Sequence, residues 1–273
     1  MIKSSYQVAT VFGIPIRLDI SLIILLGLLI MQYGDPIMGL LAAVALLLSI
    51  TLHELGHSLV AMAFGCRVRD ITLMMMGGCA TLLSMPRKAW QEFLVAAAGP
   101  AVSLCLAVLG LTAVKWVPQG GYIVLRSNFE SFLFYNIGVL NAVLFLFNLL
   151  PAFPMDGGRI LRAILQQFFM SRLKATWVAS RIGRFIAILM ALSVGYSLIS
   201  GEFHGFMFIR LVIAYFVYQA AGREYLAVLY ESQQGGGGFG GGFGGGSKPP
   251  DDTVVVSPPP YGSGKEWHDV HRM

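Results

Sequence analysis

The strongest chemical signal in this 273-residue sequence is a five-residue segment with three ionisable side chains, His53, Glu54 and His57. On a helix, residues four apart lie on one face, so both imidazoles can bind a single metal ion. Glu54 lies beside them and can hold and deprotonate a water molecule on that ion. A bound metal lowers the pKa of its water toward about 7, which supplies a nucleophile for hydrolysis. The spacing therefore predicts a metal-dependent hydrolase.

These three residues lie near one end of an apolar run, Ile37–Phe64. A charge at the centre of a bilayer costs at least about 2.5 kcal/mol, so ionisable groups inside such a run indicate a function. The alternative is a polar pair that neighbouring helices satisfy. A helix rises roughly 10 Å between His57 and Phe64, which predicts a site at that depth from the end of the run.

A catalytic zinc site needs a third protein ligand, and Asp156 is the outstanding candidate. Pro151 and Pro154 break the preceding helix, and Gly157 and Gly158 free the backbone around it. Broken backbone at membrane depth is tolerated where it lines a cavity or is buried in protein. Capping of a helix is the alternative role for Asp156. Other acidic residues near the ends of apolar runs have no histidine at helical spacing: Glu92, Glu130, Glu202 and Glu224.

Composition places these residues in a membrane protein. Apolar residues make up 56% of the chain and charged residues 12%, against about 25% charged in an ordinary soluble domain. Mean hydropathy is +0.71. These values exclude a disordered chain, a disulfide scaffold and a water-soluble enzyme. The net charge of +5 is spread over loops between apolar runs, which argues against a nucleic-acid partner.

Several apolar runs approach the length of about 20 residues that a membrane span requires. We expect an all-α polytopic membrane protein with about six transmembrane helices and a small β element on the cytoplasmic side. The sixth run carries Arg210, for which we expect snorkelling or a pair with Glu202. The six runs are Ile20–Tyr33, Ile37–Phe64, Phe93–Val114, Ser131–Leu150, Phe185–Ser200 and Phe203–Val217.

Two segments outside these runs have the pattern of extended chain, Gln7–Arg17 and Cys66–Pro86. Within the second, the stretch Thr72–Thr81 could bind substrate. A membrane helix must unwind before hydrolysis, and an extended strand edge can hold the unwound chain by strand addition. Gly77 and Gly78 would allow close approach of the two backbones. A plain surface hairpin is the alternative.

Basic residues predict the orientation in the membrane. With a cytoplasmic N-terminus, the inner segments hold thirteen Lys and Arg residues, and the outer segments with the sixth run hold three. We therefore expect a multi-pass protein of the cell membrane with cytoplasmic N- and C-termini. Arg159 and Arg162 are predicted to be interfacial anchors rather than substrate clamps.

The motif HELGH at residues 53–57, followed by NLLPAFPMDGGR at residues 148–159, resembles the site-2 protease family of intramembrane zinc metalloproteases. The segments FGIPIRLDIS and AAAGP, which begin at Phe12 and Ala96, are also similar, and the resemblance covers roughly residues 8–222. It implies that His53, His57 and Asp156 bind zinc and that Glu54 is the general base. It also implies a compact form of the family, without the PDZ domain or CBS pair of many relatives.

Asn141 and Asn148 lie seven residues apart, on nearly the same face of the fourth run. A buried amide can stabilise an oxyanion, an effect of about 2.7–4 kcal/mol where it has been measured. Hydrogen bonding between helices is the alternative role. Asn148 also belongs to the family-like motif.

We therefore predict hydrolysis of peptide bonds in or next to the transmembrane segment of a membrane-anchored protein, within the lipid bilayer. The alternatives are an intramembrane metal-ion transporter and a homologue that binds membrane substrates without cutting them. Residues 1–230 would form the metalloprotease domain. Residues 231–273, rich in Gly and Pro, would form a disordered cytoplasmic tail or a docking segment. The oligomeric state stays open.

Overall fold

The computed structural model describes residues 5–75, 77–83, 88–116, 124–201 and 207–235. Four strands form one sheet in the order β1 (Ser5–Val11), β2 (Ile14–Asp19), β3 (Val68–Met74) and β4 (Gly77–Leu82). The two hairpins are antiparallel, and β2 pairs with β3 in parallel. The predicted small β element is confirmed. The pairing of its two halves requires a crossover connection, which is made by the first two helices.

The first helices are α1 (Ile20–Gln32) and α2 (Pro36–Ala63), and α2 carries the predicted histidine pair. Asp35 caps α2 by accepting a hydrogen bond of 2.9 Å from the backbone N–H of Ile37, and proline is favoured at the first helical position. The helix ends before Gly65, whose φ of +80° turns the chain toward β3. The histidine pair therefore lies near the end of α2 from which the sheet continues.

An apolar cluster holds the sheet against α2. Ile14 and Ile16 of β2 and Ile71 and Leu73 of β3 point to one face because side chains alternate along a strand. They pack with Leu22, Ile50 and Leu55, and all seven side chains are buried. Leu55 lies between Glu54 and His57 in the sequence, so this core fixes the sheet beside the predicted site.

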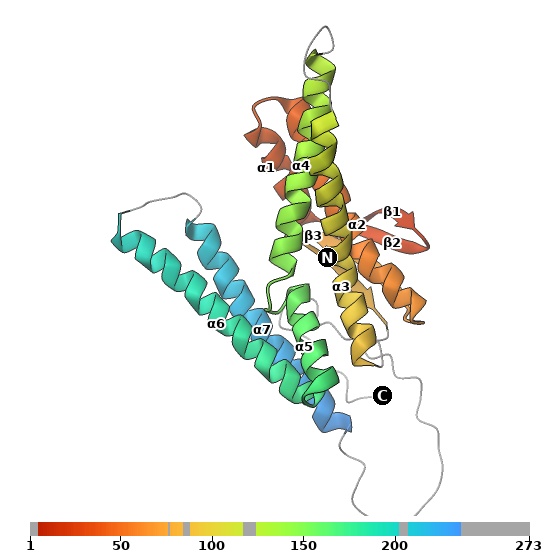
Figure 1. Cartoon of the computed structure of the whole chain (residues 1–273), viewed down its shortest axis with the longest axis vertical. Coiled ribbons are helices and arrows are strands. Elements are labelled where there is room, and N and C mark those ends of the chain that lie inside the picture. The colour runs from red at the N-terminus through yellow and green to blue at the C-terminus, as the bar shows by residue number, and fades with distance from the viewer. Residues whose placement is uncertain (1–4, 76, 84–87, 117–123, 202–206, 236–273) are drawn as a thin grey trace, which may run out of the picture.

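The remaining helices are α3 (Ala89–Ala113), α4 (Val124–Asn148), α5 (Asp156–Phe168), α6 (Arg172–Ile199) and α7 (Met207–Gly235), with a short 3₁₀ turn, η1 (Val114–Trp116), after α3. The helices α2, α3 and α4 pack side by side, and α1 packs on α2. In Figure 1, α6 and α7 form a separate pair that leans away from this group. The short helix α5 packs on both α3 and α6.

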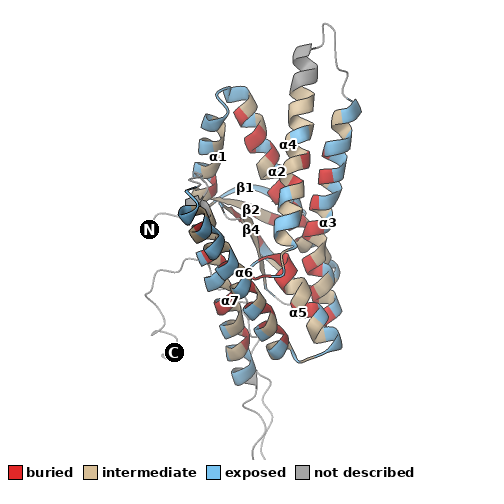
Figure 2. Ribbon diagram, turned by 60° about the vertical axis from the view of Figure 1, so that its left-hand side comes forward, coloured by how far each residue is buried: buried red, intermediate tan, exposed pale blue. Residues whose placement is uncertain are grey.

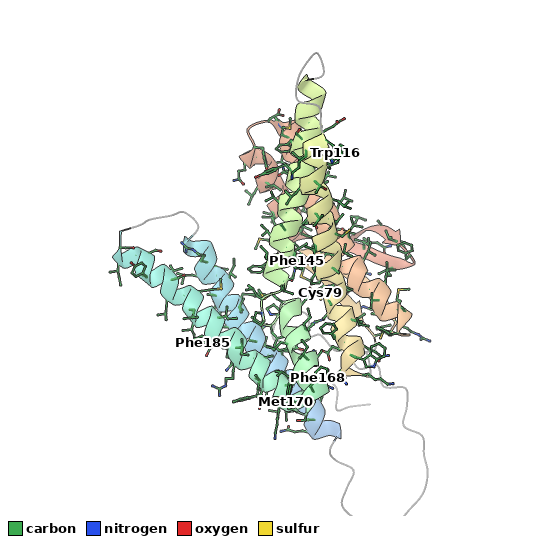
Figure 3. The ribbon with its side chains drawn as sticks, in the orientation of Figure 1. Cys79, Trp116, Phe145, Phe168, Met170 and Phe185 are labelled. Atoms are coloured by element: carbon green, nitrogen blue, oxygen red, sulfur yellow. The ribbon has the colours of Figure 1, made fainter. Side chains whose placement is uncertain are left out.

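Among the described residues, four helices are long and apolar enough to cross a membrane: Pro36–Ala63, Ala89–Trp116, Phe129–Asn148 and Arg172–Ile199. Many large apolar side chains lie on the outside of these helices. Trp116 in η1 and Phe185 on α6 are 87% and 61% exposed, and both are labelled in Figure 3. Figure 2 shows the buried residues of α2 and α3 on faces turned toward the bundle. The chain is a mostly helical membrane protein.

The structure contains one helix that was not predicted and one that begins earlier than predicted, and other predicted features lie outside the described residues. The helix α5 does not stand out in a search for membrane-length apolar runs, because it has 13 residues and mixes arginines and glutamines with leucines. The helix α6 begins at Arg172 rather than near Phe185. Its first turns carry several basic residues, so a search for apolar runs places the start too late. Glu202, the start of the sixth run and the chain from 236 to 273 are not described.

Candidate metal centre

Three side chains converge between α2 and the start of α5. The Nε2 atoms of His53 and His57 are 3.2 Å apart, and each lies 3.1 Å from Oδ2 of Asp156. His53 is 3% exposed and Asp156 9% exposed. The structure brings together the two histidines predicted from helical spacing and the aspartate predicted from the broken segment, although 103 positions separate His53 and Asp156.

This donor set fits a tetrahedral metal ion. At a metal–ligand distance of about 2.0–2.1 Å, neighbouring ligand atoms of a tetrahedron lie about 3.3 Å apart. The three observed separations of 3.1–3.2 Å lie close to that value. Two imidazoles and one carboxylate are ligands that zinc accepts in catalytic sites, where the fourth position is left for water. In the described part of the chain, these three residues form a group that could hold a metal ion.

The helix α3 orients both imidazoles through their second ring nitrogen. Nδ1 of His53 lies 2.9 Å from Oγ of Ser103, and Nδ1 of His57 lies 2.7 Å from the carbonyl oxygen of Val95. With Nε2 as the metal ligand, each Nδ1 carries the ring proton and donates to its oxygen on α3. Such contacts fix the tautomer and the ring orientation of a metal-binding histidine.

Gly99 leaves the space that the two rings occupy. A Cβ atom at this position would overlap Nε2 of His57 and would lie 2.7 Å from Nε2 of His53. Gly99 belongs to the AAAGP segment, between the residues of α3 that contact the two rings. The absence of a side chain is therefore a requirement of the centre.

Asp156 is held at the start of α5 by a tightly packed turn. A Cβ atom on Gly157 would overlap the carbonyl oxygens of Leu149 and Leu150. Gly158 lies against the backbone of Ala152 and Phe153. The two glycines thus let the chain fold back on itself directly after the proline-rich segment, and this brings the carboxylate to the histidines.

Glu54 lies next to the centre but outside the group of possible ligands. It is 8% exposed, and the edge strand β4 covers it. A Cβ atom on Gly78 would overlap Cγ and Cδ of Glu54. The predicted base and one of the two predicted substrate-binding glycines are therefore in direct contact. The other, Gly77, begins β4 with a φ of +123°.

Cys79, the next residue of β4, interacts electrostatically with Glu54 and Arg159. Burial raises the pKa of the Cys79 thiol, and Glu54 raises it further, so this side chain is an uncharged thiol at neutral pH. Figure 3 shows Cys79 at the height at which α5 begins. All three cysteines of the chain are free.

The two asparagines have different surroundings. The amide nitrogen of Asn141 donates to Oγ of Ser49 at 2.7 Å and to the carbonyl oxygen of Ile137 at 2.8 Å, and the residue is fully buried. Its donors would have to leave these partners to reach a substrate. Asn148, the last residue of α4, donates one amide N–H to the carbonyl oxygen of Leu144 at 3.0 Å. Its other N–H has no partner in the described part of the chain.

The expected interfacial position of Arg162 is wrong. Its side chain is fully buried and pairs with Glu92 and Glu224. The reason is the unpredicted helix α5, which packs between α3 and α6 and directs this residue inward. Sequence reasoning also missed Gly99, Val95 and Ser103. The glycine within AAAGP and a serine four residues later in an apolar run are the signals that point to a helix contact, whereas a backbone carbonyl leaves none.

Fold and site together define a helical membrane protein with a candidate metal site of two histidines and one carboxylate inside its bundle. The model of peptidase family M50 matches residues 41–120 and 117–190, which include all three candidate ligands. The chain belongs to peptidase family M50.

Similar proteins carry consistent names. A protein of Synechocystis, sll0528, named as a candidate zinc metalloprotease, is 37% identical over 236 residues, covering 81% of this chain and 59% of that protein. The zinc metalloprotease MJ0392 of Methanocaldococcus jannaschii is 35% identical over 226 residues, covering 81% of this chain and 60% of that protein. The chain thus spans about 60% of the length of these two relatives.

A solved structure has the same fold. The site-2 protease from Methanocaldococcus jannaschii matches with a TM-score of 0.57 and 35% sequence identity. The match covers 81% of this chain and 95% of that structure. The resemblance inferred from the motifs is confirmed.

Proposed function

We propose that this chain is an intramembrane zinc metalloprotease that hydrolyses peptide bonds in or next to the transmembrane segment of membrane-anchored proteins. The observation that carries the proposal is the convergence of three donor atoms on one point, with the buried carboxylate of Glu54 beside them. Membership of peptidase family M50 and the names of the similar proteins support the reaction and the metal.

We assign the zinc ligands to His53, His57 and Asp156. Zinc in such a site acidifies a water molecule and polarises the carbonyl of the scissile bond. Glu54 accepts the proton of the attacking water and delivers it to the leaving nitrogen. Its carboxylate is available for this role because it is outside the ligand group and is shielded from bulk water by β4.

We propose that the side-chain amide of Asn148 donates the hydrogen bond that stabilises the oxyanion. It lies at the end of α4, where the chain turns toward Asp156, and one of its N–H groups has no partner in the described part of the chain. Asn141 is the second predicted donor. Its present partners, Ser49 and the carbonyl of Ile137, give it the role of joining α2 to α4.

We propose that the unwound substrate adds to the free edge of β4. Among the described residues, the sheet order leaves this strand unpaired on one side. Strand edges bind extended peptides through backbone hydrogen bonds. Gly78 lies against Glu54, so a chain that pairs with this part of β4 passes close to the base. Gly77 and Gly78 have no side chains to keep the two backbones apart.

In the membrane, we propose six spans, with α1 and α7 supplying two in addition to the four long apolar helices. The bias of basic residues favours cytoplasmic N- and C-termini. Cleavage then occurs nearer the cytoplasmic face and releases a cytoplasmic fragment. Residues 1–230 form the protease domain in this proposal, and residues 231–273 form a separate tail. Its first five residues continue α7, and residues 236–273 lie outside the described part of the chain.

The experiment that tests this proposal compares wild type with Glu54→Gln in detergent and in proteoliposomes. We expect both proteins to bind zinc, and only wild type to cleave a membrane-anchored reporter substrate. Full cleavage by Glu54→Gln would refute the assignment of the base. Zinc flux across proteoliposome membranes, with no cleavage by wild type, would support the transporter alternative instead.

A further inference from the structure

A buried cluster of charges lies outside the metal centre and joins three helices. The guanidinium of Arg162 on α5 donates from Nε and Nη2 to one oxygen of Glu92 on α3, at 2.8 and 2.5 Å. Its Nη1 donates to Glu224 on α7 at 2.6 Å. The Arg162 side chain has no exposed surface and also lies over the ring of Phe153, 5.1 Å from its centroid.

The cluster is electrically balanced by a second arginine. Arg159, one turn earlier on α5, interacts electrostatically with both Glu224 and Glu92, and also with Asp156. Two cations and two carboxylates therefore share this region. Buried charges are retained where each one has partners, and the loss of one partner leaves the other charges uncompensated. This arrangement fixes α5 against α3 and α7 at defined points.

One face of α3 connects this cluster to the two histidines. Glu92, Val95, Gly99 and Ser103 follow one another at spacings of three and four residues, so they line one face of the helix. Val95 and Ser103 hold the imidazoles, and Gly99 makes room for them. The same face that positions both histidines thus carries the carboxylate that binds Arg162.

The short helix α5 carries the other half of the centre. Asp156 is its first residue, and Arg162 lies six residues later, about 9 Å along the axis at 1.5 Å per residue. A helix of this length moves as one body, so a shift at Arg162 also moves Asp156. Metal sites accept ligand displacements of only about 0.2 Å.

We propose that Arg162 is a positioning residue for the metal centre: by binding Glu92 and Glu224, it holds α5 in the place where Asp156 meets His53 and His57. This inference rests on the proposed zinc site. The forked guanidinium is suited to the task, because one rigid group contacts carboxylates on two different helices. The contact with Glu224 also ties the α6–α7 pair to the helix that carries the third ligand.

The test is the zinc dissociation constant of the full-length protein in detergent, measured by competition with a chelator. The variants are Arg162→Lys, Glu92→Gln and the double variant, each checked for folding by thermal unfolding. Arg184→Lys is the control for loss of an arginine contact between helices, since Arg184 on α6 lies over the ring of Tyr218 on α7, as Arg162 lies over the ring of Phe153, and the contact joins α6 to α7 rather than α5 to α3.

We expect each single variant to bind zinc about 10- to 100-fold more weakly, as is typical when a contact that supports metal ligands is lost. The double variant should bind no more weakly than the weaker single variant, because both single changes already disrupt the same contact between Arg162 and Glu92. Arg184→Lys should bind zinc as wild type does. If Arg162→Lys does not fold, Glu224→Gln replaces it, since the Glu224 side chain is 31% exposed and forms only one arm of the cluster.

Wild-type zinc affinity in folded Arg162→Lys, or in Glu224→Gln where that variant replaces it, would overturn the inference and leave the protease assignment intact. A loss of affinity of the same size in Arg184→Lys would also overturn it, because the effect would then reflect general loosening of the bundle. An absence of zinc binding in wild type would overturn both proposals.

Discussion

The close approach of Gly99 to the two histidines predicts a specific effect of adding one methyl group. In Gly99→Ala, the new Cβ would lie 2.7 Å from Nε2 of His53 and would overlap Nε2 of His57. Ordinary van der Waals contact begins at 3.4 Å, so the nitrogen of His53 must move by about 0.7 Å, the difference between the two distances. That exceeds the tolerance of about 0.2 Å for a metal ligand.

We therefore expect Gly99→Ala to weaken zinc binding by at least about tenfold, within the range of about 10–100-fold that altered support of metal ligands produces. The crowding should also lower the free energy of unfolding by about 1–3 kcal/mol, the usual cost of overpacking a close-packed interior. Chelator competition measures the first effect, and thermal unfolding in the same detergent measures the second.

The control is Gly195→Ala on α6, where an added Cβ meets no atom within 4 Å. In a helix, this change is expected to stabilise by about 0.5–1 kcal/mol and to leave zinc affinity unchanged. A folded Gly99→Ala protein that binds zinc as tightly as wild type would refute the geometry of the centre, because both imidazoles would then have room that the structure does not give them.

Three further changes probe the surroundings of the centre. Ser103→Ala removes the partner of one imidazole and should weaken zinc binding about 10–100-fold with little change in thermal stability; unchanged affinity in chelator competition would contradict this. Gly157→Ala places a Cβ against the carbonyl of Leu150, and at a cost of about 1–3 kcal/mol the midpoint of thermal unfolding should fall by several degrees; an unchanged midpoint would show that the turn has spare room. Gly78→Ala displaces Glu54 but no ligand, so cleavage of a reporter should fall while zinc content stays at the wild-type level; full cleavage would argue against contact between β4 and the base.

The candidate ligands could be predicted because polar residues are scarce in apolar helices. His53, Glu54 and His57 stand in a run that has no other ionisable side chain, and helical spacing alone puts the two imidazoles on one face. Asp156 lies at a helix break that the prolines before it and the glycines after it predict. Each of these residues therefore has a local signal in the sequence. The structure was needed only to show that their side chains lie close together.

The supporting residues carried weaker signals or none. The carbonyl of Val95 contacts His57 through the backbone, which no residue type reveals. Ser103 is one small residue among many in α3. The sequence predicts a membrane-surface position for Arg162, because α5 is too short to stand out as a span; its burial follows from the packing of α5 on α3. These roles depend on contacts between segments far apart in the chain.

The fold also has elements that the sequence predicts and elements that it does not. The runs that became α2, α3 and α4 could be located from hydropathy, and both extended segments became strands. Their union into one sheet depends on the parallel pairing of β2 with β3, which the alternation within either segment does not determine. The first turns of α6 carry several basic residues, so a search for apolar runs does not find where this helix begins.

The most direct test of the metal centre is the zinc content of purified protein, determined by elemental analysis of wild type, Glu54→Gln and Asp156→Ala. A site with three protein ligands predicts about one zinc per chain in wild type and in Glu54→Gln, and a marked loss in Asp156→Ala. Equal zinc content in Asp156→Ala and wild type would remove Asp156 from the ligand set. Wild-type protein that binds no zinc, even after the metal is added back, would contradict the metalloprotease account as a whole.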